Sequence, residues 1–486
     1  SADPDAALLG ISLLADASPN RAQWYHALRT APDLLNRLVR LAAGSRTLVQ
    51  TVARRPEWLD LLVSDEIVVR GIKPREAFAS ELSERLSPIQ STRLPMPAYR
   101  EGTIANDGKA DTSQSAEDDA FEKTVALYCQ RERLRIGARE LWGETSAPAV
   151  STELSYLADA VLERVLRHSA AAVAPPNGLH VDEIIPHLAV IGLGKLGGLE
   201  MSFYSDLDVL FVCDDAVLPS LQSRSQDDTL YSLIVATAEH VMRTISSLRQ
   251  EGVPLAIDVR LRPEGRFGPL VASPTQLEAY FGTRAEVWER QTLLKARYVA
   301  GSGEVASHFL STCQRFVYER PFTEEEADAV RAMKSRIESE RLNTEDRFTN
   351  IKLGHGGMSD IEFLVQLLQL RYGRDHISVR ATRTLDALDA LAEVGAIPAP
   401  DAERLNRNYR FLSRLRNRLA LLTGQAVDIF PADPRRARAL AVGFGIADTP
   451  SIKAEAAIRR VYDRRMRETR RIFERLFHGN QRKGGQ

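Results

Sequence analysis

The sequence predicts an α+β protein that is mostly helical, with one small mixed sheet between an N-terminal and a C-terminal helical region. Two apolar runs, residues 188–191 and a second run that begins at Asp206, are separated by little more than a glycine turn, which indicates two strands without a crossover helix. Residues 255–262 alternate strictly between apolar and polar side chains, which is the period of a half-buried strand. Long stretches on both sides place leucine and valine at helical spacing.

Composition and charge narrow the class of protein. The 486 residues suit roughly two or three domains, and the 64 Lys and Arg residues nearly balance the 65 Asp and Glu residues. Because the charges balance, the protein has no net positive charge that would attract nucleic acid, and we expect no nucleic-acid partner. The three cysteines lie far apart without metal-ligand spacing, which favours a reducing compartment. Because no apolar run approaches the roughly 18 residues of a membrane span, and no signal peptide opens the chain, we expect a cytoplasmic protein without a membrane.

Changes in composition divide the chain. We expect an N-terminal helical region (1–98), a flexible acidic linker (99–120), a catalytic domain (121–345), a regulatory C-terminal helical bundle (346–478) and a disordered tail (479–486). Within the first region, Pro56 ends one helix before the next begins. Further helices are predicted at 121–142, 152–170 and 227–249.

The glycine turn after the first apolar run is the first candidate binding element. It satisfies the GxGxxG pattern of dinucleotide-binding folds, but the eight residues between Gly197 and Asp206 leave no room for the helix of those folds. A P-loop also fails, because Gly198 stands where that motif has lysine. Glycines let backbone N–H groups approach a phosphate, and a lysine supplies a charge for it. The predicted phosphate-binding residues are Gly194, Lys195, Gly197 and Gly198; the alternative is a tight turn beside a solvated acidic pair.

Two aspartates follow the turn on one strand. Asp206 and Asp208 share a strand face, because successive side chains point to opposite faces. Carboxylates this close raise each other's pKa unless a cation lies between them. Mg²⁺ is the natural candidate, because it prefers oxygen ligands and is often held by one or two carboxylates plus substrate phosphates.

The alternating strand 255–262 adds a third carboxylate. Asp258 lies on its polar face, and the strand is predicted to pair beside the aspartate strand. Arg260 and Arg262 share that face, placed to balance the carboxylates or to hold phosphate oxygens. The alternative is an exposed edge strand with a row of ion pairs.

Two later segments carry weaker candidates. Lys295 and Arg297 either reach a triphosphate or are solvated helix charges. In the segment 351–373, His355 lies in a glycine turn and Ser359 is the predicted N-cap of the helix that follows. Asp360 and Glu362 are placed in its first turn, where the helix dipole favours acids; the competing hypothesis has them close over a nucleotide.

The ordered series of motifs resembles one family. The series is GLGKLGG (192–198), SDLDVLFV (205–212), IDVRLRPEGRFGPLV (257–271), VWERQTLLKARYVAG (287–301) and IKLGHGGMSDIEFLVQLLQLRYG (351–373). It looks like the bifunctional glutamine synthetase adenylyltransferase/adenylyl-removing family, with similar spacing from about residue 20 to about residue 480. The resemblance implies a DNA polymerase β-like nucleotidyltransferase fold flanked by helical domains.

The same resemblance implies an activity. Family members transfer AMP from ATP to a tyrosine of glutamine synthetase, or remove it by phosphorolysis, and so regulate nitrogen assimilation under a PII signal protein and glutamine. Carried over residue by residue, the family pattern makes Asp206, Asp208 and Asp258 the metal ligands. We expect two Mg²⁺ ions, with Mn²⁺ as the alternative metal, and we expect Ser205 among the nucleotide-binding residues.

Full-length family members carry two such halves in tandem, whereas this chain has one nucleotidyltransferase signature. Its opening helical segment and its end shortly after the last helix resemble the C-terminal, adenylylating half, and we favour adenylylation. The alternatives are the removing half and, from another class, a catalytically silent module that binds nucleotide or PII. The three intact aspartates argue against the silent module.

Overall fold

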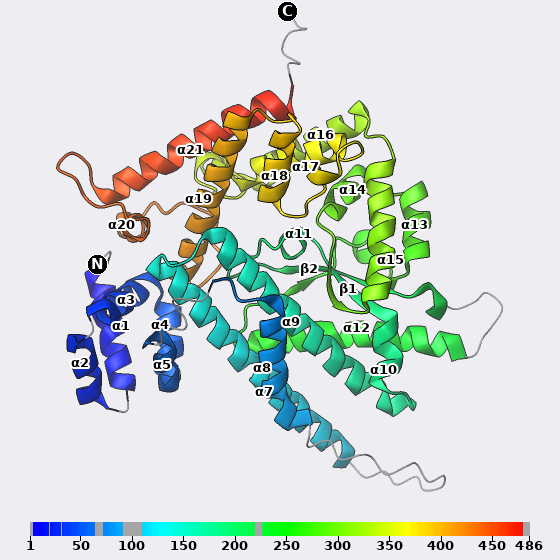
Figure 1. Ribbon diagram of the computed structural model, residues 1–486, viewed down its shortest axis with the longest axis horizontal. Coiled ribbons are helices and arrows are strands. Elements are labelled where there is room, and N and C mark those ends of the chain that lie inside the picture. Colours follow the sequence, from blue (N-terminus) through cyan, green and yellow to red (C-terminus); the bar gives the residue numbers. More distant parts are fainter. Residues whose placement is uncertain are drawn as a thin grey trace, which may run out of the picture.

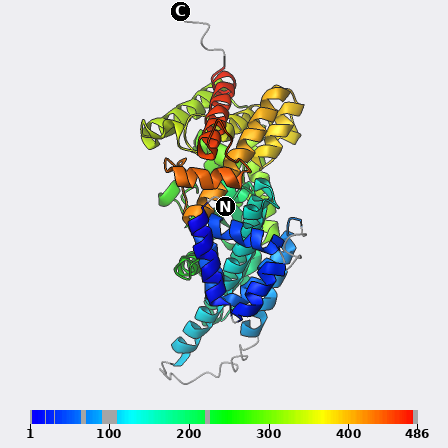
Figure 2. The same ribbon diagram turned by 90° about the vertical axis from the view of Figure 1, so that its left-hand side faces the viewer.

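The computed structural model describes residues 3–18, 20–30, 32–63, 71–90, 109–218 and 226–479. It is mostly helical, with one small mixed sheet, as the sequence predicts (Figures 1 and 2). In Figure 1 the first helices (blue) lie at the lower left and the last helices (orange and red) lie at the top. The predicted tail lies outside the described residues, apart from Gly479.

The first helices form a small bundle. Its members are α1 (Pro4–Ala17), α2 (Arg21–Thr30), α3 (Pro32–Gly44), α4 (Arg46–Arg54) and α5 (Leu59–Val63). Leucines and valines at helical spacing, such as Leu38 and Val52, are fully buried in it. Ser45 caps α4 by accepting a hydrogen bond from the backbone N–H of Leu48, and Pro56 ends that helix as predicted.

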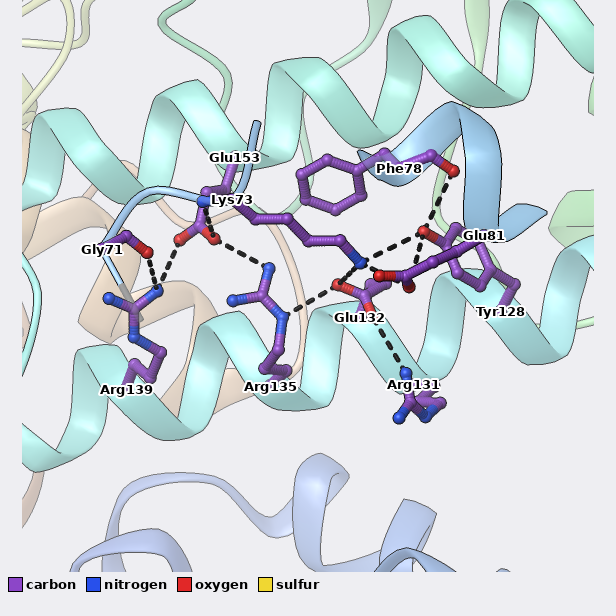
Figure 3. A network of polar contacts seen from close by, with 10 residues as sticks. All are labelled: Gly71, Lys73, Phe78, Glu81, Tyr128, Arg131, Glu132, Arg135, Arg139 and Glu153. Carbon is purple, nitrogen blue, oxygen red and sulfur yellow. Dashed lines mark hydrogen bonds and ion pairs between the residues drawn. The ribbon is translucent and has the colours of Figure 1, made fainter. Parts of the chain in front are cut away.

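A buried network of charges joins α7 (Arg75–Gln90) to the long helices α8 (Lys109–Trp142) and α9 (Ala147–Val173), as Figure 3 shows. Glu132 of α8 is fully buried and pairs with Lys73 at 3.2 Å and with Arg135 at 2.8 Å. Glu153 of α9 is also fully buried and pairs with Arg135 and Arg139 at 2.8 and 3.0 Å. Burial raises the pKa of the Glu132 carboxyl, but Arg135 and Lys73 lower it by more. The network therefore holds the segment before α7 in one position.

Helix α8 corrects the predicted linker. It begins at Lys109, so residues 109–120 are helical, and residues 99–108 lie outside the described residues. Residues 109–120 contain no glycine or proline that would stop a helix. The helical conformation of the rest of α8 therefore extends through them toward the N-terminus of the helix. The predicted helices 121–142 and 152–170 fall within α8 and α9.

The sheet has five strands: β1 (Leu188–Gly192), β2 (Leu207–Cys213), β3 (Ile257–Asp258), β4 (Val271–Ala272) and β5 (Arg297–Gly301). Their order is β3-β2-β1-β5, and β4 also pairs with β2. β1 runs antiparallel to β2 and β5, whereas β3 and β4 run parallel to β2.

Helices cover both faces of the sheet. Val190 and Phe211 belong to the core shared with α8, α9 and α12 (Gln226–Gln250). Ile191 and Leu210 belong to the core on the other face, with α13 (Pro274–Thr283) and α15 (Gly303–Gln314). Burial on both faces explains why β1 and β2 are uninterrupted apolar runs in the sequence.

The third predicted strand is shorter than its alternating pattern indicates. Only Ile257 and Asp258 are strand residues, although they pair beside β2 as predicted. The carboxylate of Asp258 accepts a hydrogen bond from the backbone N–H of Arg260, which turns the chain. The guanidinium of Arg262 then donates to the carbonyl groups of Val259, Arg266 and Gly268, so the chain closes into a loop.

Apart from the single turn α11, the other α-helices of the described residues are α10 (Val181–Ile184), α14 (Val287–Leu293), α16 (Glu324–Arg341), α17 (Met358–Tyr372), α18 (Thr384–Glu393), α19 (Ala399–Thr423), α20 (Pro434–Gly443) and α21 (Ala454–Phe477). The N-cap of α17 is Gly357, not the predicted Ser359, whose hydroxyl accepts a hydrogen bond from Lys334. Arg418 of α19 pairs with the buried Glu140 of α8 at 3.1 Å, so the C-terminal helices pack directly on the N-terminal ones.

Two further properties concern the whole described chain. Cys129, Cys213 and Cys313 are buried free thiols. Within the described ranges, no helix combines the length and the apolar character that a membrane span requires.

Candidate active site

The glycine turn lies between β1 and the single helical turn α11 (Gly194–Gly197). Gly194 has a φ of +51°, and a Cβ atom on it would lie 2.3 Å from Oδ2 of Asp208. A Cβ atom on Gly197 would lie 1.9 Å from the carbonyl oxygen of Lys295. Both positions therefore require glycine, the first to bring the Asp208 carboxylate against the turn and the second to admit the start of β5. Gly198 is less constrained, with Glu200 Oε2 3.1 Å from its virtual Cβ.

Arg297 supports the turn from behind. Its guanidinium donates to the carbonyl oxygens of Leu196 at 2.9 Å and Gly197 at 3.2 Å. The same guanidinium pairs with the buried Asp159 of α9 at 2.7 Å, and Asp159 also pairs with Arg75 of α7 at 2.8 Å. Arg297 is therefore bound to the turn and to Asp159, and the geometry does not support the hypothesis that it reaches a triphosphate. We call this side of the turn the back and the side that carries Asp208 the front.

Lys295 is also committed to a structural contact. Its ammonium group pairs with Glu200 at 2.5 Å and donates to the hydroxyl of Thr384 at 3.0 Å. Burial lowers the pKa of Lys295, but the carboxylates of Glu200 and Glu362 raise it by more. The prediction that Lys295 binds phosphate is corrected: its charge joins the end of the turn to α18.

Three carboxylates lie at the front of the turn. Asp208 and Asp258 are register partners on β2 and β3, and the exposed Asp206 immediately precedes β2. Burial, followed by the charges of Asp258 and Asp206, raises the pKa of Asp208 to about 6. Asp258 binds Arg260 through two carboxylate oxygens at 2.9 and 2.5 Å, and this contact lowers its pKa. Arg260 thus balances a carboxylate, which was one of its two predicted roles.

Oxygen ligands at one place fit a divalent cation, because a cation would offset both the burial and the repulsion from Asp258 and Asp206 that raise the pKa of Asp208. In this structure Asp258 forms an ion pair with Arg260. Among the described residues, no three His, Cys, Asp or Glu side chains are gathered closely enough to hold a metal ion. Mg²⁺ usually takes only one or two protein carboxylates and completes its shell with phosphates and water. A complete protein cage is therefore not needed for the residues to fit Mg²⁺.

The C-terminal helical bundle contributes cations that the sequence analysis missed. Arg416 of α19 pairs with Asp428, and its Nη1 lies 3.5 Å from the hydroxyl of Ser202 in the loop before β2. The backbone of Ile351 donates to the carbonyl of Asp428 at 2.6 Å, which brings Lys352 to the same place.

Lys195 lies among these groups at the front of the turn. Burial, and then the positive charges of Arg416 and Lys352, lower its pKa to about 7. Lys352 and Lys195 in turn partly offset the raised pKa of Asp208. Lys195, Lys352 and Arg416 therefore form a cation cluster that faces the carboxylates. The motif IKLGHGG contains Lys352, but nothing in the local pattern singles it out.

Family models match most of the chain. A model described as glutamate-ammonia ligase adenylyltransferase matches residues 35–312. The chain belongs to this family. A second model, described as GlnD PII-uridylyltransferase, matches residues 331–477. The three front carboxylates lie in the first match, whereas Lys352 and Arg416 lie in the second, so the candidate site draws on both.

Individual relatives agree. The chain is 32% identical over 482 residues to the bifunctional glutamine synthetase adenylyltransferase/adenylyl-removing enzyme of Streptomyces avermitilis. The alignment covers 98% of this chain and 43% of the relative. It is 31% identical over 455 residues to the protein of that name from Mycobacterium avium, covering 91% and 41%. The chain therefore spans less than half the length of these family members.

Two other predicted candidates have structural partners instead. Asp360 is fully buried, pairs with Lys334 at 2.7 Å and Arg470 at 3.1 Å, and accepts from the backbone N–H of Gly356. This arrangement corrects the hypothesis that Asp360 closes over a nucleotide. His355 lies edge-on to the ring of Phe348 and 3.6 Å from Glu338, and burial together with Arg470 lowers its pKa.

The last three predicted residues differ in position. Glu362 accepts a hydrogen bond from the hydroxyl of Tyr409 at 3.0 Å, and although burial raises its pKa, Lys295 and Lys195 lower it by more. Glu362 therefore adjoins the cation cluster. Ser205 accepts from the backbone N–H of Ser202 at 2.9 Å and shapes the loop before Asp206. Arg262 folds its own loop, which corrects its predicted role as a phosphate ligand.

Proposed function

We propose that this chain is a nucleotidyltransferase that transfers AMP from ATP to a tyrosine hydroxyl of glutamine synthetase, on a DNA polymerase β-like core. One arrangement carries the proposal. The carboxylate of Asp208 lies against the glycine turn, next to Asp206 and Asp258. Lys195 of the same turn has no carboxylate within ion-pair distance among the described residues. Membership of the adenylyltransferase family supports the reaction class.

In the proposed mechanism, positively charged groups of the chain bind the triphosphate and its carboxylates bind the metal ion. The backbone of residues 194–198 and the ammonium of Lys195 hold the triphosphate, and Lys352 and Arg416 add positive charge from the C-terminal bundle. Asp206, Asp208 and Asp258 would hold Mg²⁺, and the bound ion would stabilise the attacking and leaving oxygens of an in-line displacement. The tyrosine oxygen forms the new bond to the α-phosphorus, and pyrophosphate leaves. Asp258 is a proton acceptor only after Arg260 releases it, because their contact lowers its pKa.

We further propose control by a PII signal protein and by glutamine. The second family match, to a protein class named for its action on PII, supports the first of these partners. The opening helical segment favours the adenylylating direction. The same three carboxylates serve phosphorolytic removal of AMP equally well, so the products decide the direction.

The test offers the protein two reactions. One tube contains unmodified glutamine synthetase, Mg²⁺ and ATP labelled on the α-phosphate; the other contains adenylylated glutamine synthetase and inorganic phosphate. We expect label on the synthetase and pyrophosphate in the first tube. ADP in the second tube alone would replace adenylylation with removal, and no product in either tube would reject the enzymatic proposal.

A further inference from the structure

A cavity of about 210 Å³ lies between α3, α8, α19 and α20, where the first helices of the chain meet the last ones (Figure 1). Its polar lining consists of Asn36 and Arg40 of α3 and Arg418 of α19. Apolar side chains and the glycines Gly44 and Gly443 form the rest. The cavity is smaller than the pockets of roughly 300–1,000 Å³ that hold drug-sized ligands, so it suits a small ligand. None of the described groups at the front of the glycine turn lines it.

The guanidinium of Arg418 has one nitrogen left for a ligand. Arg418 is only 5% exposed. Its Nε donates to the carboxylate of Glu140 at 3.1 Å, and its Nη2 donates to the backbone carbonyl of Glu140 at 2.5 Å. Its Nη1 has no hydrogen-bond acceptor among the described residues, and a Cβ atom on Gly443 would lie 2.3 Å from this nitrogen. Because position 443 is a glycine, Nη1 lies at the cavity wall as a donor that a ligand can use.

Positive charge exceeds negative charge around this cavity. The fully buried carboxylate of Glu140 is shared by Arg418 and by Arg414, whose Nε lies 3.5 Å from it. Arg40 donates to the backbone carbonyl of Trp142 at 2.8 Å and has no ion pair with a described carboxylate. Burial, together with the charges of Arg414 and Arg40, lowers the pKa of Arg418 to about 10 against the opposing effect of Glu140. Three guanidinium groups therefore share one carboxylate.

Two unmatched positive charges suit a dianion. The ion pair of Arg37 with Glu144, at 3.5 Å, lies on the segments that also carry Arg40 and Trp142, and it adds no net charge. A phosphate group carries about −1.5 to −2 charges near pH 7 and offers several acceptor oxygens. Guanidinium groups bind phosphate oxygens well, because their N–H donors form a rigid fork. A single carboxylate would match only half of the excess charge.

We propose that this cavity binds a phosphate dianion, either inorganic phosphate or the phosphate group of a small monoester, and that the bound anion holds the N-terminal bundle against the C-terminal helices. Helices α3 and α8 lie in the first family match, whereas α19 and α20 lie in the second, so the anion joins the two matched regions. The site uses no group assigned to AMP transfer and stands apart from the proposed function. A ligand that binds only the folded chain stabilises it by mass action.

The experiment titrates the whole chain by calorimetry with inorganic phosphate and, in a second arm, with glycerol 3-phosphate as the monoester. We expect Arg40→Gln to weaken binding by about tenfold or more, because it removes a charged donor. Val442→Glu should do the same, since it places a competing carboxylate at an exposed position of the wall. Arg29→Gln is the matched control, an exposed arginine of the same bundle outside the cavity. Phosphate should also raise the free energy of unfolding of the wild type more than that of Val442→Glu.

Lys195→Met distinguishes this cavity from the front of the turn, where phosphate could also bind. Phosphate binding that persists in Lys195→Met and weakens in Arg40→Gln would support the cavity, whereas the opposite result would overturn it. Equal affinity in the wild type, Arg40→Gln and Val442→Glu would also overturn the site, as would the absence of any phosphate binding. Acetate is a monoanion, so its binding as tightly as phosphate would overturn the assignment to a dianion. Failure of AMP transfer with normal phosphate binding would reject the proposed function and leave this site intact.

Discussion

Lys195 and Lys295 lie at the front and the back of one glycine turn, and the two sides differ in how their charges are matched. At the front, the cations Arg416 and Lys352 affect Lys195 more strongly than the carboxylates Glu362 and Asp428 do, and Asp208 is affected more strongly by other carboxylates than by cations. At the back, Lys295 is bound to Glu200, and Arg297 is bound to Asp159. Lys195 and Asp208 have no ion pair with a described residue and are available to a ligand, whereas the front groups Arg416 and Asp258 are paired with Asp428 and Arg260. The matched charges at the back hold backbone in place. The partners of each charged group, rather than its residue type, therefore distinguish the groups that can bind a ligand from those that support the turn.

The largest expected effect comes from the front carboxylates. Asp208→Asn should lower the rate of AMP transfer by about 10³-fold or more, because positioning and charge dominate catalysis of phosphoryl transfer. The fold should remain intact, since Asn has the shape of Asp and the substitution removes a repulsion. The measurement is transfer of α-labelled phosphate, with circular dichroism to follow the fold. Asp182→Asn, an exposed aspartate of α10, should leave the rate unchanged. A rate near wild type in Asp208→Asn would remove the metal site from the front.

A substitution at the back should act on stability first. Asp159→Ala leaves Arg297 and Arg75 without their shared carboxylate, and removal of one partner of a buried ion pair costs about 3–5 kcal/mol. We expect the free energy of unfolding in urea to fall by that amount and the Michaelis constant for ATP to rise as the turn loosens. Asp182→Ala serves as the control. An unchanged unfolding free energy would show that the back of the turn is held by other contacts.

The two lysines give the most direct comparison. Lys195→Met should weaken ATP binding by about 10–100-fold, the range for a hydrogen-bonded charged group, with little loss of stability. Lys295→Met should do the reverse, because it leaves the carboxylate of Glu200 partly buried and unpaired. Calorimetric measurement of ATP affinity, together with urea unfolding of both variants, tests whether the two substitutions have these opposite effects. Equal losses of affinity in both would contradict the division into front and back.

The low pKa of Lys195 predicts a pH dependence of ATP binding. The ammonium of the free protein loses its proton as the pH rises through about 7, whereas bound phosphate favours the charged form. Affinity for ATP should therefore be greatest below pH 7 and fall above it, by at most about tenfold per pH unit. Lys195→Met should show no such fall. A wild-type affinity constant from pH 6 to pH 9 would be inconsistent with this assignment.

The smallest effect is expected at Arg260. Its pair with Asp258 is largely solvated on the arginine side, so Arg260→Gln should change the unfolding free energy by less than about 1 kcal/mol. The same substitution frees Asp258 and should strengthen binding of Mn²⁺, used as a paramagnetic probe of the metal site. Arg266→Gln, an exposed arginine in the same loop, is the control. Unaltered Mn²⁺ affinity in Arg260→Gln would separate Asp258 from the metal site.

Elements whose signals are local can be predicted from the sequence alone. The apolar runs of β1 and β2, the glycine turn between them and the leucine spacing of the helices follow from short-range periodicity, and the structure contains all of them. The pairing of the Asp258 strand beside β2 is also predicted from the sequence, whereas the register that makes Asp208 and Asp258 partners comes from the structure. Local signals gave a wrong prediction in two places. β3 is shorter than predicted, because the side chain of Asp258 accepts a hydrogen bond from the backbone of Arg260. Residues 109–120 are helical rather than a linker, because helix α8 extends through them.

Which charged groups have partners depends on contacts between distant segments, which the sequence does not reveal. Lys295, Asp360 and Arg262 look as suitable for phosphates or nucleotides as Lys195 in the sequence, yet each is bound by other groups of the protein. Arg416 joins the front of the turn from a helix more than 200 residues away along the chain. The physical reason is that the free energy of a charge depends on the groups around it, and packing brings those groups from distant segments.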